Sequence, residues 1–401
     1  MEDIKELFEL VPEDEIRGRI SRFQERMVAR GVDFSLILQN VDIFYFTGTL
    51  QKGYLCIPAD REPLFLVQRD WRRAQQESPL NIEKMGSIKE LLSFITSMGL
   101  SEKQRVGLEL DVLPVTLFLR LQGFLGERDF VDVSADVLRC RARKSPFEIE
   151  QIKKSGKIVE HVLSTVREHC REGMAEVELD ALLQAEGRKA GHQGWLRMRG
   201  LNQEMSNICL LAGKSAAFQS FGDTPLRGYG ATHAIAQGAS HRKIGRNEPI
   251  IIDYGGGYNG YTTDETRTFV IGRLDEEFER AYEVACRILQ FCEDHAREGV
   301  NGRELYQQSV DIVSKYGLEE YFMGYGDGKV KFIGHGLGLE INEIPVIADG
   351  RDEILEEGMV FAFEPKFVFP DQGAVAVEVD YIVRKDGVER TAGFPTDIVY
   401  L

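Results

Sequence analysis

Two predicted hairpins bring acidic side chains into pairs, and this pairing is the strongest chemical signal in the sequence. The segment 249–272 is typical of a strand, a glycine-rich turn and a second strand. If the turn is centred between Tyr258 and Asn259, Asp253 lies directly opposite Asp264, and such opposed residues have Cβ atoms about 4.5–5.5 Å apart on one face. Two carboxylates this close repel each other unless a proton or a cation lies between them. By itself, the pair favours a metal site and a solvated surface hairpin equally.

A second pair of acids lies in a far more apolar hairpin. The sequence MVFAFEPKFVFPDQGAVAVEVDYIV contains two apolar strands, and a turn centred on Asp371 places Glu364 opposite Glu378. Each glutamate stands in a run of Phe, Ala and Val, where a buried acid is costly unless it is paired or binds a metal. Two such pairs in one domain favour metal ligation over two solvated surfaces.

One histidine joins the four carboxylates as a candidate ligand. His335 lies in GHGLGLE, between glycines that allow backbone and ligands to approach closely. One histidine with four acidic residues is a hard, oxygen-rich ligand set that suits two divalent ions, with Mn²⁺ expected and Co²⁺ or Zn²⁺ as alternatives. Two ions about 3.5–4 Å apart can share a hydroxide at neutral pH and stabilise a tetrahedral intermediate. The set therefore predicts a hydrolase.

The elements that position these residues follow a separate α/β region. A helix is predicted over Ser21–Arg30, and the runs DIFYFTG, GYLCIPAD and EPLFLVQ, which begin at residues 42, 53 and 62, predict the short strands of a meander. Alternating helix and strand patterns continue from there. We assign this region to a first domain, residues 1–140.

A long amphipathic helix over Pro146–Cys170 is expected to begin the second domain, which we assign to residues 141–401. Ser145 can cap this helix, and Glu148 three residues later completes a capping box. Another amphipathic helix is predicted over residues 275–297, with one apolar stripe that faces the core.

Composition and charge limit the classes of partner. The chain has 401 residues, of which 43% are hydrophobic and 28% charged, as expected for a globular protein with an ample core. Its formal net charge of -16 disfavours nucleic acid and anionic membranes as partners. Neither a secretory signal nor a membrane-spanning segment is predicted. The six cysteines are scattered without a CxxC pair, which predicts free thiols and a cytoplasmic protein.

The motifs IIIDYGGGYNGYTTDETRTF, GHGLGLEINEIP, FAFEP and VAVEVD occur in an order and at spacings that resemble the creatinase/aminopeptidase P/prolidase family, the M24 "pita-bread" metallopeptidases. The segment NVDIFYFTG resembles the N-terminal domain of that family. The resemblance implies an α+β fold, with a smaller α/β creatinase-like domain over residues 1–140 and a pita-bread catalytic domain over residues 141–401. It also implies a homodimer and a small peptide or amide substrate, as in Xaa-Pro dipeptidases and aminopeptidases.

The family pattern, carried over to this sequence, implies roles for five residues. Asp253 would bind one metal ion, and Asp264 and Glu378 would bridge two ions. His335 and Glu364 would complete the second site and act as the catalytic residues. Glu364 would move the proton of a metal-bound hydroxide that attacks the Xaa-Pro peptide bond.

Three positions depart from the family pattern. Asn342 replaces a histidine that usually contacts the substrate, Gln237 replaces a second histidine, and Ala376 replaces an arginine two residues before the last glutamate. We assign Asn342 and Gln237 to substrate binding, although neither amide can carry a proton at neutral pH. Two alternatives remain beside Xaa-Pro hydrolysis. One is a metalloenzyme of this fold that acts on a small non-peptide amide or amidine, and the other is a catalytically silent metal-binding homologue.

Overall fold

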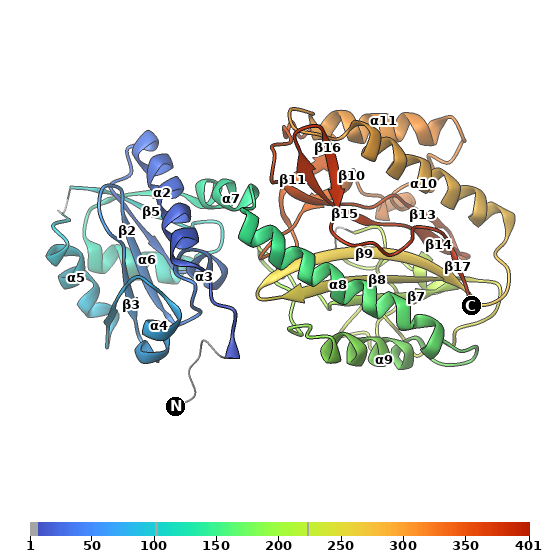
Figure 1. The fold of residues 1–401 in the computed structure, drawn as a ribbon, viewed down its shortest axis with the longest axis horizontal. Helices are drawn as coiled ribbons and strands as arrows, with labels where there is room; N and C mark the ends of the chain where they lie inside the picture. The colour runs from blue at the N-terminus through green and yellow to red at the C-terminus, as the bar shows by residue number, and fades with distance from the viewer. Residues whose placement is uncertain (1–6, 101–102, 223) are drawn as a thin grey trace. The chain divides into compact units, whose positions relative to one another are not determined.

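A computed structural model describes residues 7–100, 103–222 and 224–401. The chain divides into two compact units. The N-terminal unit comprises the chain up to Arg141 together with Gly200–Asn202, and the C-terminal unit comprises Ala142–Arg199 and Gln203–Leu401. Both units mix helices with sheets (Figure 1), which confirms the predicted α+β class.

The N-terminal unit is built on a six-stranded mixed sheet in the order β4-β3-β2-β1-β5-β6. Its central strands β1, β2 and β3 are antiparallel neighbours, whereas β5 and β6 continue the sheet in parallel from β1. The strands are β1 (Phe34–Ile37), β2 (Gly53–Pro58), β3 (Leu64–Val67), β4 (Asn81–Lys84), β5 (Arg105–Leu108) and β6 (Asp129–Asp132).

Helices cover both faces of this sheet. One face, which includes Phe34 and Leu36, packs in a common core with residues of α5 and α6. On the opposite face, the hydroxyl of Ser35 lies 3.5 Å from Met27 of α2. The helices are α2 (Glu13–Arg30), α3 (Asn40–Thr47), α4 (Trp71–Glu77), α5 (Leu91–Ser97), α6 (Val115–Leu125) and α7 (Ser134–Ala142). The helix predicted from Ser21 is therefore longer at its N-terminal end than expected.

One predicted strand of this region is wrong. The run DIFYFTG belongs to helix α3, whose N-terminus is capped by the side chain of Gln39 and which ends at Gly48 in the left-handed conformation. Its Asp42 is fully buried and paired with Arg141 at 2.7 Å. The aromatic and β-branched residues raise strand propensity, but burial on every side and the two caps override that preference.

Within its described residues, the C-terminal unit contains three sheets. A four-stranded sheet has the order β17-β9-β8-β7, a five-stranded sheet has the order β11-β10-β12-β15-β16, and β13 and β14 form a two-stranded ribbon. The strands are β7 (Ile208–Ala212), β8 (Pro249–Tyr258), β9 (Tyr261–Val270), β10 (Phe332–Gly336), β11 (Glu343–Ala348), β12 (Val360–Phe363), β13 (Lys366–Phe369), β14 (Gly373–Ala376), β15 (Val379–Arg384), β16 (Gly387–Arg390) and β17 (Val399–Tyr400).

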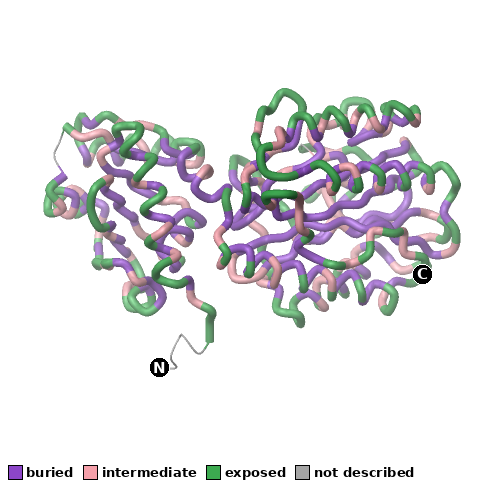
Figure 2. The backbone as a smooth tube through the Cα atoms, turned by 45° about the horizontal axis from the view of Figure 1, so that its top comes forward, coloured by how far each residue is buried: buried purple, intermediate pink, exposed green. Residues whose placement is uncertain are grey.

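Four helices cover the outer sides of these sheets. Helices α8 (Pro146–His169) and α9 (Glu176–Lys189) share a core with β7 and β8, and α10 (Glu276–His295) and α11 (Gly302–Ser314) share another with β12 to β15. Figure 2 shows buried strands between helices that are exposed along one side. The capping box at Ser145 and Glu148 is present as predicted, and so is the buried stripe of the helix predicted over residues 275–297.

The first acidic hairpin has a different register from the one predicted. Tyr258 pairs with Tyr261, so the turn is formed by Asn259 and Gly260 rather than centred one position earlier. Both turn residues have positive φ, 47° and 90°, which is the conformation that favours Asn-Gly in two-residue hairpin turns. As a result, Asp253 lies opposite Thr266, and the predicted direct pair with Asp264 does not form.

Two further sequence predictions concern cysteines and membranes. All six cysteines are free, and four of them are buried. Across the described ranges, the structure contains no helix that is long and apolar enough to cross a membrane.

The cap of α8 gives a stability prediction. We expect Ser145→Ala to lower the free energy of unfolding by about 1 kcal/mol, because the Ser145 hydroxyl accepts a hydrogen bond from the Glu148 N–H at 3.2 Å and a lost N-cap typically costs this much. Ser164→Ala in the same helix is the matched control, since the exposed hydroxyl of Ser164 only donates to the His161 carbonyl. Denaturant unfolding followed by circular dichroism measures both, and equal effects would contradict the role of the cap.

Candidate metal centre

Asp253 and Asp264 face the interior of the C-terminal unit from neighbouring strands. Ile250, Ile252 and Tyr254 of β8 pack against α8 and α9, so the alternate residue Asp253 points to the opposite, inner face. Asp264 of β9 lies opposite Gly255 and therefore shares that face. The two aspartates are thus diagonal neighbours, a spacing of about 7–8 Å. The face was predicted correctly, although the register was not.

Glu364 and Glu378 lie at a break within one long hairpin. Phe363 pairs with Val379 on one side of the break, and Lys366 pairs with Ala376 on the other, in the same register. That register is the one predicted to place Glu364 opposite Glu378. Between these two paired segments, the backbone N–H of each glutamate donates a hydrogen bond to a different strand. The N–H of Glu364 donates to Ile333 of β10 at 2.8 Å, and that of Glu378 donates to Thr266 of β9 at 3.0 Å.

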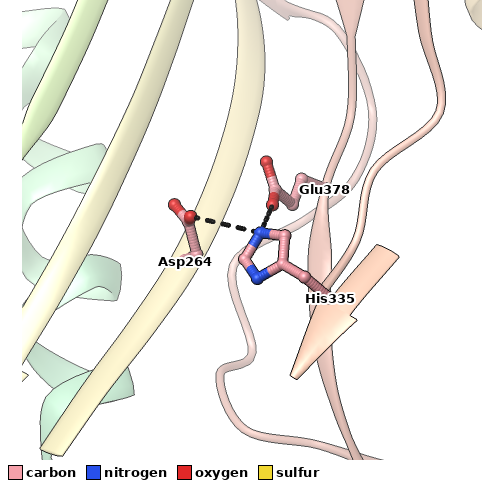
Figure 3. Close-up of side chains that lie close together, drawn as sticks. All are labelled: Asp264, His335 and Glu378. Atoms are coloured by element: carbon pink, nitrogen blue, oxygen red, sulfur yellow. Dashed lines mark ion pairs between the residues drawn. The ribbon is translucent and has the colours of Figure 1, made fainter. Parts of the chain in front are cut away.

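His335 of β10 brings a nitrogen to the acidic side chains. Its Nε2 lies 3.6 Å from Glu364, 3.9 Å from Asp264 and 4.0 Å from Glu378. Figure 3 shows the carboxylates of Asp264 and Glu378 pointing to this ring nitrogen from different strands. One potential ligand atom from each of these three residues lies within 4.8 Å of the other two. Four of the five predicted ligands therefore meet around one point.

The chemistry of this cluster suits a divalent cation. Asp264 Oδ1 and Glu378 Oε1 are buried and accept no hydrogen bond from any residue that the structure describes. Burial, followed by the charges of Glu378 and Asp253, raises the pKa of Asp264 well above its usual range. Burial likewise raises the pKa of Glu378 to about 8. Buried oxygens without donors, beside an imidazole nitrogen, are the ligands that a divalent ion would satisfy.

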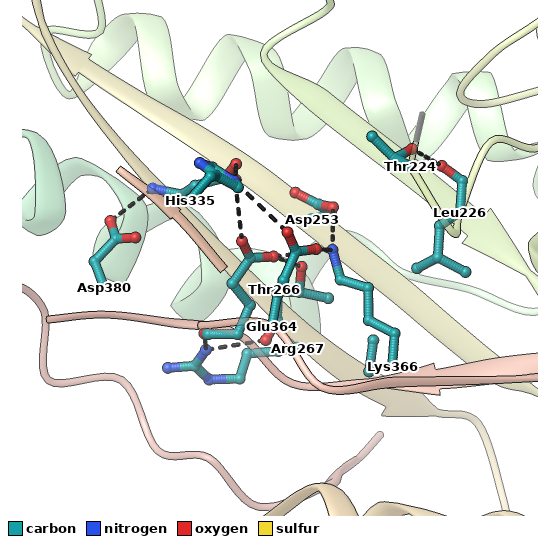
Figure 4. A network of polar contacts seen from close by, with 12 residues as sticks. Thr224, Leu226, Asp253, Thr266, Arg267, His335, Glu364, Lys366 and Asp380 are labelled. Atoms are coloured by element: carbon teal, nitrogen blue, oxygen red, sulfur yellow. Dashed lines mark hydrogen bonds and ion pairs between the residues drawn. The ribbon is translucent and has the colours of Figure 1, made fainter. Parts of the chain in front are cut away.

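Lys366 is a member of the site that the sequence analysis missed. Its ammonium lies 2.5 Å from Glu364, 3.1 Å from Glu378 and 3.3 Å from Asp253. Figure 4 shows the side chain of Lys366 extending toward Asp253 and Glu364. Only 4% of its side chain is exposed. The fifth predicted ligand, Asp253, is therefore held by a lysine of the chain itself.

The ammonium of Lys366 is held in its charged form. Burial by itself lowers the pKa of this amine, but the charges of Glu364, Glu378 and Asp253 outweigh that effect and keep its pKa well above the ordinary value. Two unit charges about 4 Å apart interact by about 4 kcal/mol at an effective dielectric of ~20. The three carboxylates would otherwise repel one another, and Lys366 compensates them.

A sequence signal for Lys366 existed in its spacing. The lysine stands two residues after Glu364 in an apolar strand, where side chains two apart share a face, and it lies opposite the small Ala376. Lysine is almost never fully buried unless it is paired. A lysine in FEPKFVF, beside two buried glutamates, therefore indicates an ion pair within the acidic cluster.

Neighbouring polar groups orient the ligands. The hydroxyl of Thr266 donates to Glu378 Oε2 at 2.7 Å, and Asp380 accepts a hydrogen bond from the Asp264 N–H at 2.7 Å. Arg267, which is buried, donates to the Glu378 carbonyl at 2.6 Å and to Glu265 at 2.8 Å. These contacts fix the backbone and side chains that carry the carboxylates.

The two amides assigned to substrate binding each make two hydrogen bonds, Asn342 to backbone only and Gln237 to one side chain and one backbone carbonyl. Asn342 accepts from the Arg199 N–H and donates to the Arg199 carbonyl, both at 2.8 Å. Gln237 accepts from Arg227 at 3.1 Å and donates to the Glu204 carbonyl at 2.9 Å. An amide side chain can donate two hydrogen bonds and accept two, and these contacts use one of each kind.

Two protein-family models match this chain. Metallopeptidase family M24 matches residues 150–385, and the Creatinase/Prolidase N-terminal domain matches residues 19–143. Together these matches confirm the family resemblance and the pita-bread fold with a creatinase-like N-terminal domain.

Individual relatives extend over nearly the whole chain. An Xaa-Pro dipeptidase from Pyrococcus furiosus is 26% identical over 377 residues, which cover 94% of this chain and 97% of the relative. The structure of an X-Pro aminopeptidase from Thermotoga maritima is 25% identical, with a TM-score of 0.79 and coverage of 95% and 99%. An Xaa-Pro dipeptidase structure from Bacillus anthracis has a TM-score of 0.82 at 24% identity, with coverage of 96% and 100%, and it supports the fold.

The raised acid pKa values predict proton release on metal binding. Burial raises the pKa of Glu378 to about 8, so this carboxyl is protonated at lower pH when no metal is bound. A carboxylate must lose its proton to bind a metal. We therefore expect the affinity for Mn²⁺ to rise as pH rises toward about 8, with protons released below that value. Calorimetry in buffers of different ionisation enthalpy counts those protons.

A matched control for this experiment is Asp180→Asn. Asp180 also has a raised pKa, of about 6, caused by burial on helix α9, but it lies outside the cluster. Its loss should leave proton release unchanged, whereas Glu378→Gln should reduce it. Affinity that does not change with pH would contradict the prediction.

Proposed function

This chain belongs to metallopeptidase family M24, and we propose that it hydrolyses the Xaa-Pro bond of dipeptides in a metal-dependent reaction. The observation that carries the proposal is that the buried Asp264 and Glu378 converge with the partly exposed His335, so that one potential ligand atom of each lies within 4.8 Å of the other two. The names of relatives that match over most of the chain, such as the Xaa-Pro dipeptidase from Pyrococcus furiosus, support the substrate class.

The proposed roles follow from the side chains. A divalent ion, when bound, supplies positive charge that polarises a carbonyl and acidifies water. Asp264, His335 and Glu378 would hold that ion. Glu364 directs Oε1 toward His335 and Oε2 toward Lys366, so its inward oxygen is placed to take a proton from the nucleophile and pass it to the leaving amine. Lys366 fixes the orientation of this carboxylate.

The substrate side of the site is also part of the proposal. We retain Asn342 and Gln237 as substrate-binding residues, each with one donor and one acceptor position beyond the contacts described above. Asn342 additionally ties the 341–343 segment to Arg199 through two hydrogen bonds. It would therefore position that segment as well as contact the substrate.

The proposal also includes the native metal ion, the cellular location and the partners. We infer that Mn²⁺ is the native ion, because oxygen ligands dominate the site and carboxylate ligands suit this ion, with Co²⁺ or Zn²⁺ as substitutes. The six free cysteines support a reducing, cytoplasmic location. A homodimer is proposed from the family resemblance. Neither nucleic acid nor a membrane is proposed as a partner, since the net charge of -16 opposes both.

The activity is tested with dipeptides in the presence of Mn²⁺. We expect hydrolysis of Ala-Pro and Met-Pro in preference to Ala-Ala, and loss of activity after chelation with recovery on return of Mn²⁺. Glu364→Gln should lower kcat by about 10²-fold or more, because loss of a proton-transfer group typically has that effect. Elemental analysis should show that this variant still binds metal.

Controls separate the alternatives. Glu277→Gln changes an exposed acid on helix α10 and should leave kcat unchanged. Turnover of small amides or amidines with none of Xaa-Pro dipeptides would favour the non-peptide alternative. Full Xaa-Pro activity in Glu364→Gln would contradict its proton-transfer role.

A further inference from the structure

Glu364 and Glu378 each direct one carboxylate oxygen to the ring nitrogen of His335 and the other to the ammonium of Lys366. For both residues, Oε1 faces the Nε2 of His335, at 3.6 Å for Glu364 and 4.0 Å for Glu378. For both residues, Oε2 faces the Nζ of Lys366, at 2.5 Å and 3.1 Å. The two glutamates therefore extend from His335, a candidate metal ligand, to a cation of this chain, the ammonium of Lys366.

The ammonium lies where a second metal ion would bind. In the two-ion arrangement expected from the resemblance, Asp253 holds one ion. Here Lys366 contacts Asp253 at 3.3 Å as well as the two glutamates. A divalent ion binds carboxylate oxygens at about 2.0–2.2 Å, so an ion on these oxygens would compete with Nζ for the same space. Two cations there would also repel each other.

The lysine is confined to this position by its strand. In β13, Phe367 and Phe369 pack into the core with α10, whereas Val368 faces the cluster that contains Ile251 and Ala376. Lys366 shares the face of Val368 and lies opposite Ala376, whose small side chain leaves room beside it. Only 4% of its side chain is exposed, so the ammonium is buried among the carboxylates rather than placed in solvent.

The other half of the cluster retains metal-binding capacity. Asp264 Oδ1 and Glu378 Oε1 are buried without a donor among the described residues. His335 Nε2 lies 4.0 Å from Glu378 Oε1 and 3.9 Å from the other oxygen of Asp264, Oδ2. We propose that this centre binds a single divalent ion at Asp264, His335 and Glu378, with the Lys366 ammonium as its second cation. The inference rests on the proposed metal dependence but not on the Xaa-Pro substrate. It replaces the two ions expected from the sequence.

Metal content tests the inference directly. The full-length wild-type chain is loaded with excess Mn²⁺, freed of loose ions by gel filtration and analysed for manganese per chain. We expect close to one ion. Lys366→Ala and Lys366→Met remove the ammonium and should bind close to two ions, and a coupled two-ion signal in electron paramagnetic resonance should replace the isolated-ion signal of the wild type.

Two further variants define which residues hold the second ion. Lys153→Met removes a partly exposed lysine that pairs with Glu389, outside the cluster, and should stay at one ion. Asp253→Asn combined with Lys366→Ala should return to one ion, because Asp253 would be a ligand of the second ion. Circular dichroism verifies that each variant is folded, and Lys366→Met preserves side-chain volume if Lys366→Ala does not fold.

The results also separate this inference from the proposed function. Two ions or none in the wild type would overturn the inference, as would one ion in a folded Lys366→Met variant. Dipeptide hydrolysis is assayed on the same samples. One ion in the wild type without hydrolysis of Xaa-Pro dipeptides would reject the substrate class and keep the single-ion centre. Two ions with hydrolysis would reject the single-ion centre and keep the substrate class.

Discussion

The burial of four carboxylates on facing strands is the constraint on which the C-terminal unit depends. Asp264, Glu364 and Glu378 are almost fully buried, at 4%, 3% and 1% exposure, and Asp253 is half-buried beside them. Buried acids at these separations repel one another unless protons or cations lie between them. The ammonium of Lys366 compensates the charge on one side of the cluster. On the other side lie the imidazole of His335 and carboxylate oxygens that accept no hydrogen bond from the described residues. Chemistry at the centre follows from this balance of charge.

The fold accommodates these buried acids by interrupting the hydrogen-bond ladder of one hairpin at Glu364 and Glu378. A continuous ladder between the strands of Glu364 and Glu378 would satisfy both backbones within the hairpin. Instead, their N–H groups donate to Ile333 and Thr266, on the strands that carry His335 and Asp264. The break therefore connects both strands of the hairpin to β10 and β9. Each ligand is held by main-chain hydrogen bonds as well as by its side chain, which supports a site of defined geometry.

Lys366 distinguishes this centre from a site built only of metal ligands. A lysine ammonium is a fixed single charge with three donors, whereas a divalent ion carries twice the charge and polarises bound groups. The ammonium of Lys366 orients Asp253, Glu364 and Glu378 through ion pairs. Ala376, which departs from the family pattern by lacking a basic side chain, lies directly across the ladder from Lys366. The positive charge absent from one strand is thus present on its partner.

The sequence by itself determined the candidate metal ligands, their faces and the Glu364–Glu378 register, because strand alternation and apolar flanks fix which side chains are buried together. It also determined the cap of α8. The Asn259–Gly260 turn decided the register that places Asp253 opposite Thr266. Burial on all sides decided that the residues of α3 form a helix rather than the predicted strand. The spacing of Lys366 from Glu364 indicates an ion pair within the acidic cluster, but only the tertiary structure decided that the ammonium also contacts Asp253 and Glu378. These two carboxylates lie on other strand segments, so their contact with Lys366 depends on packing between the sheets.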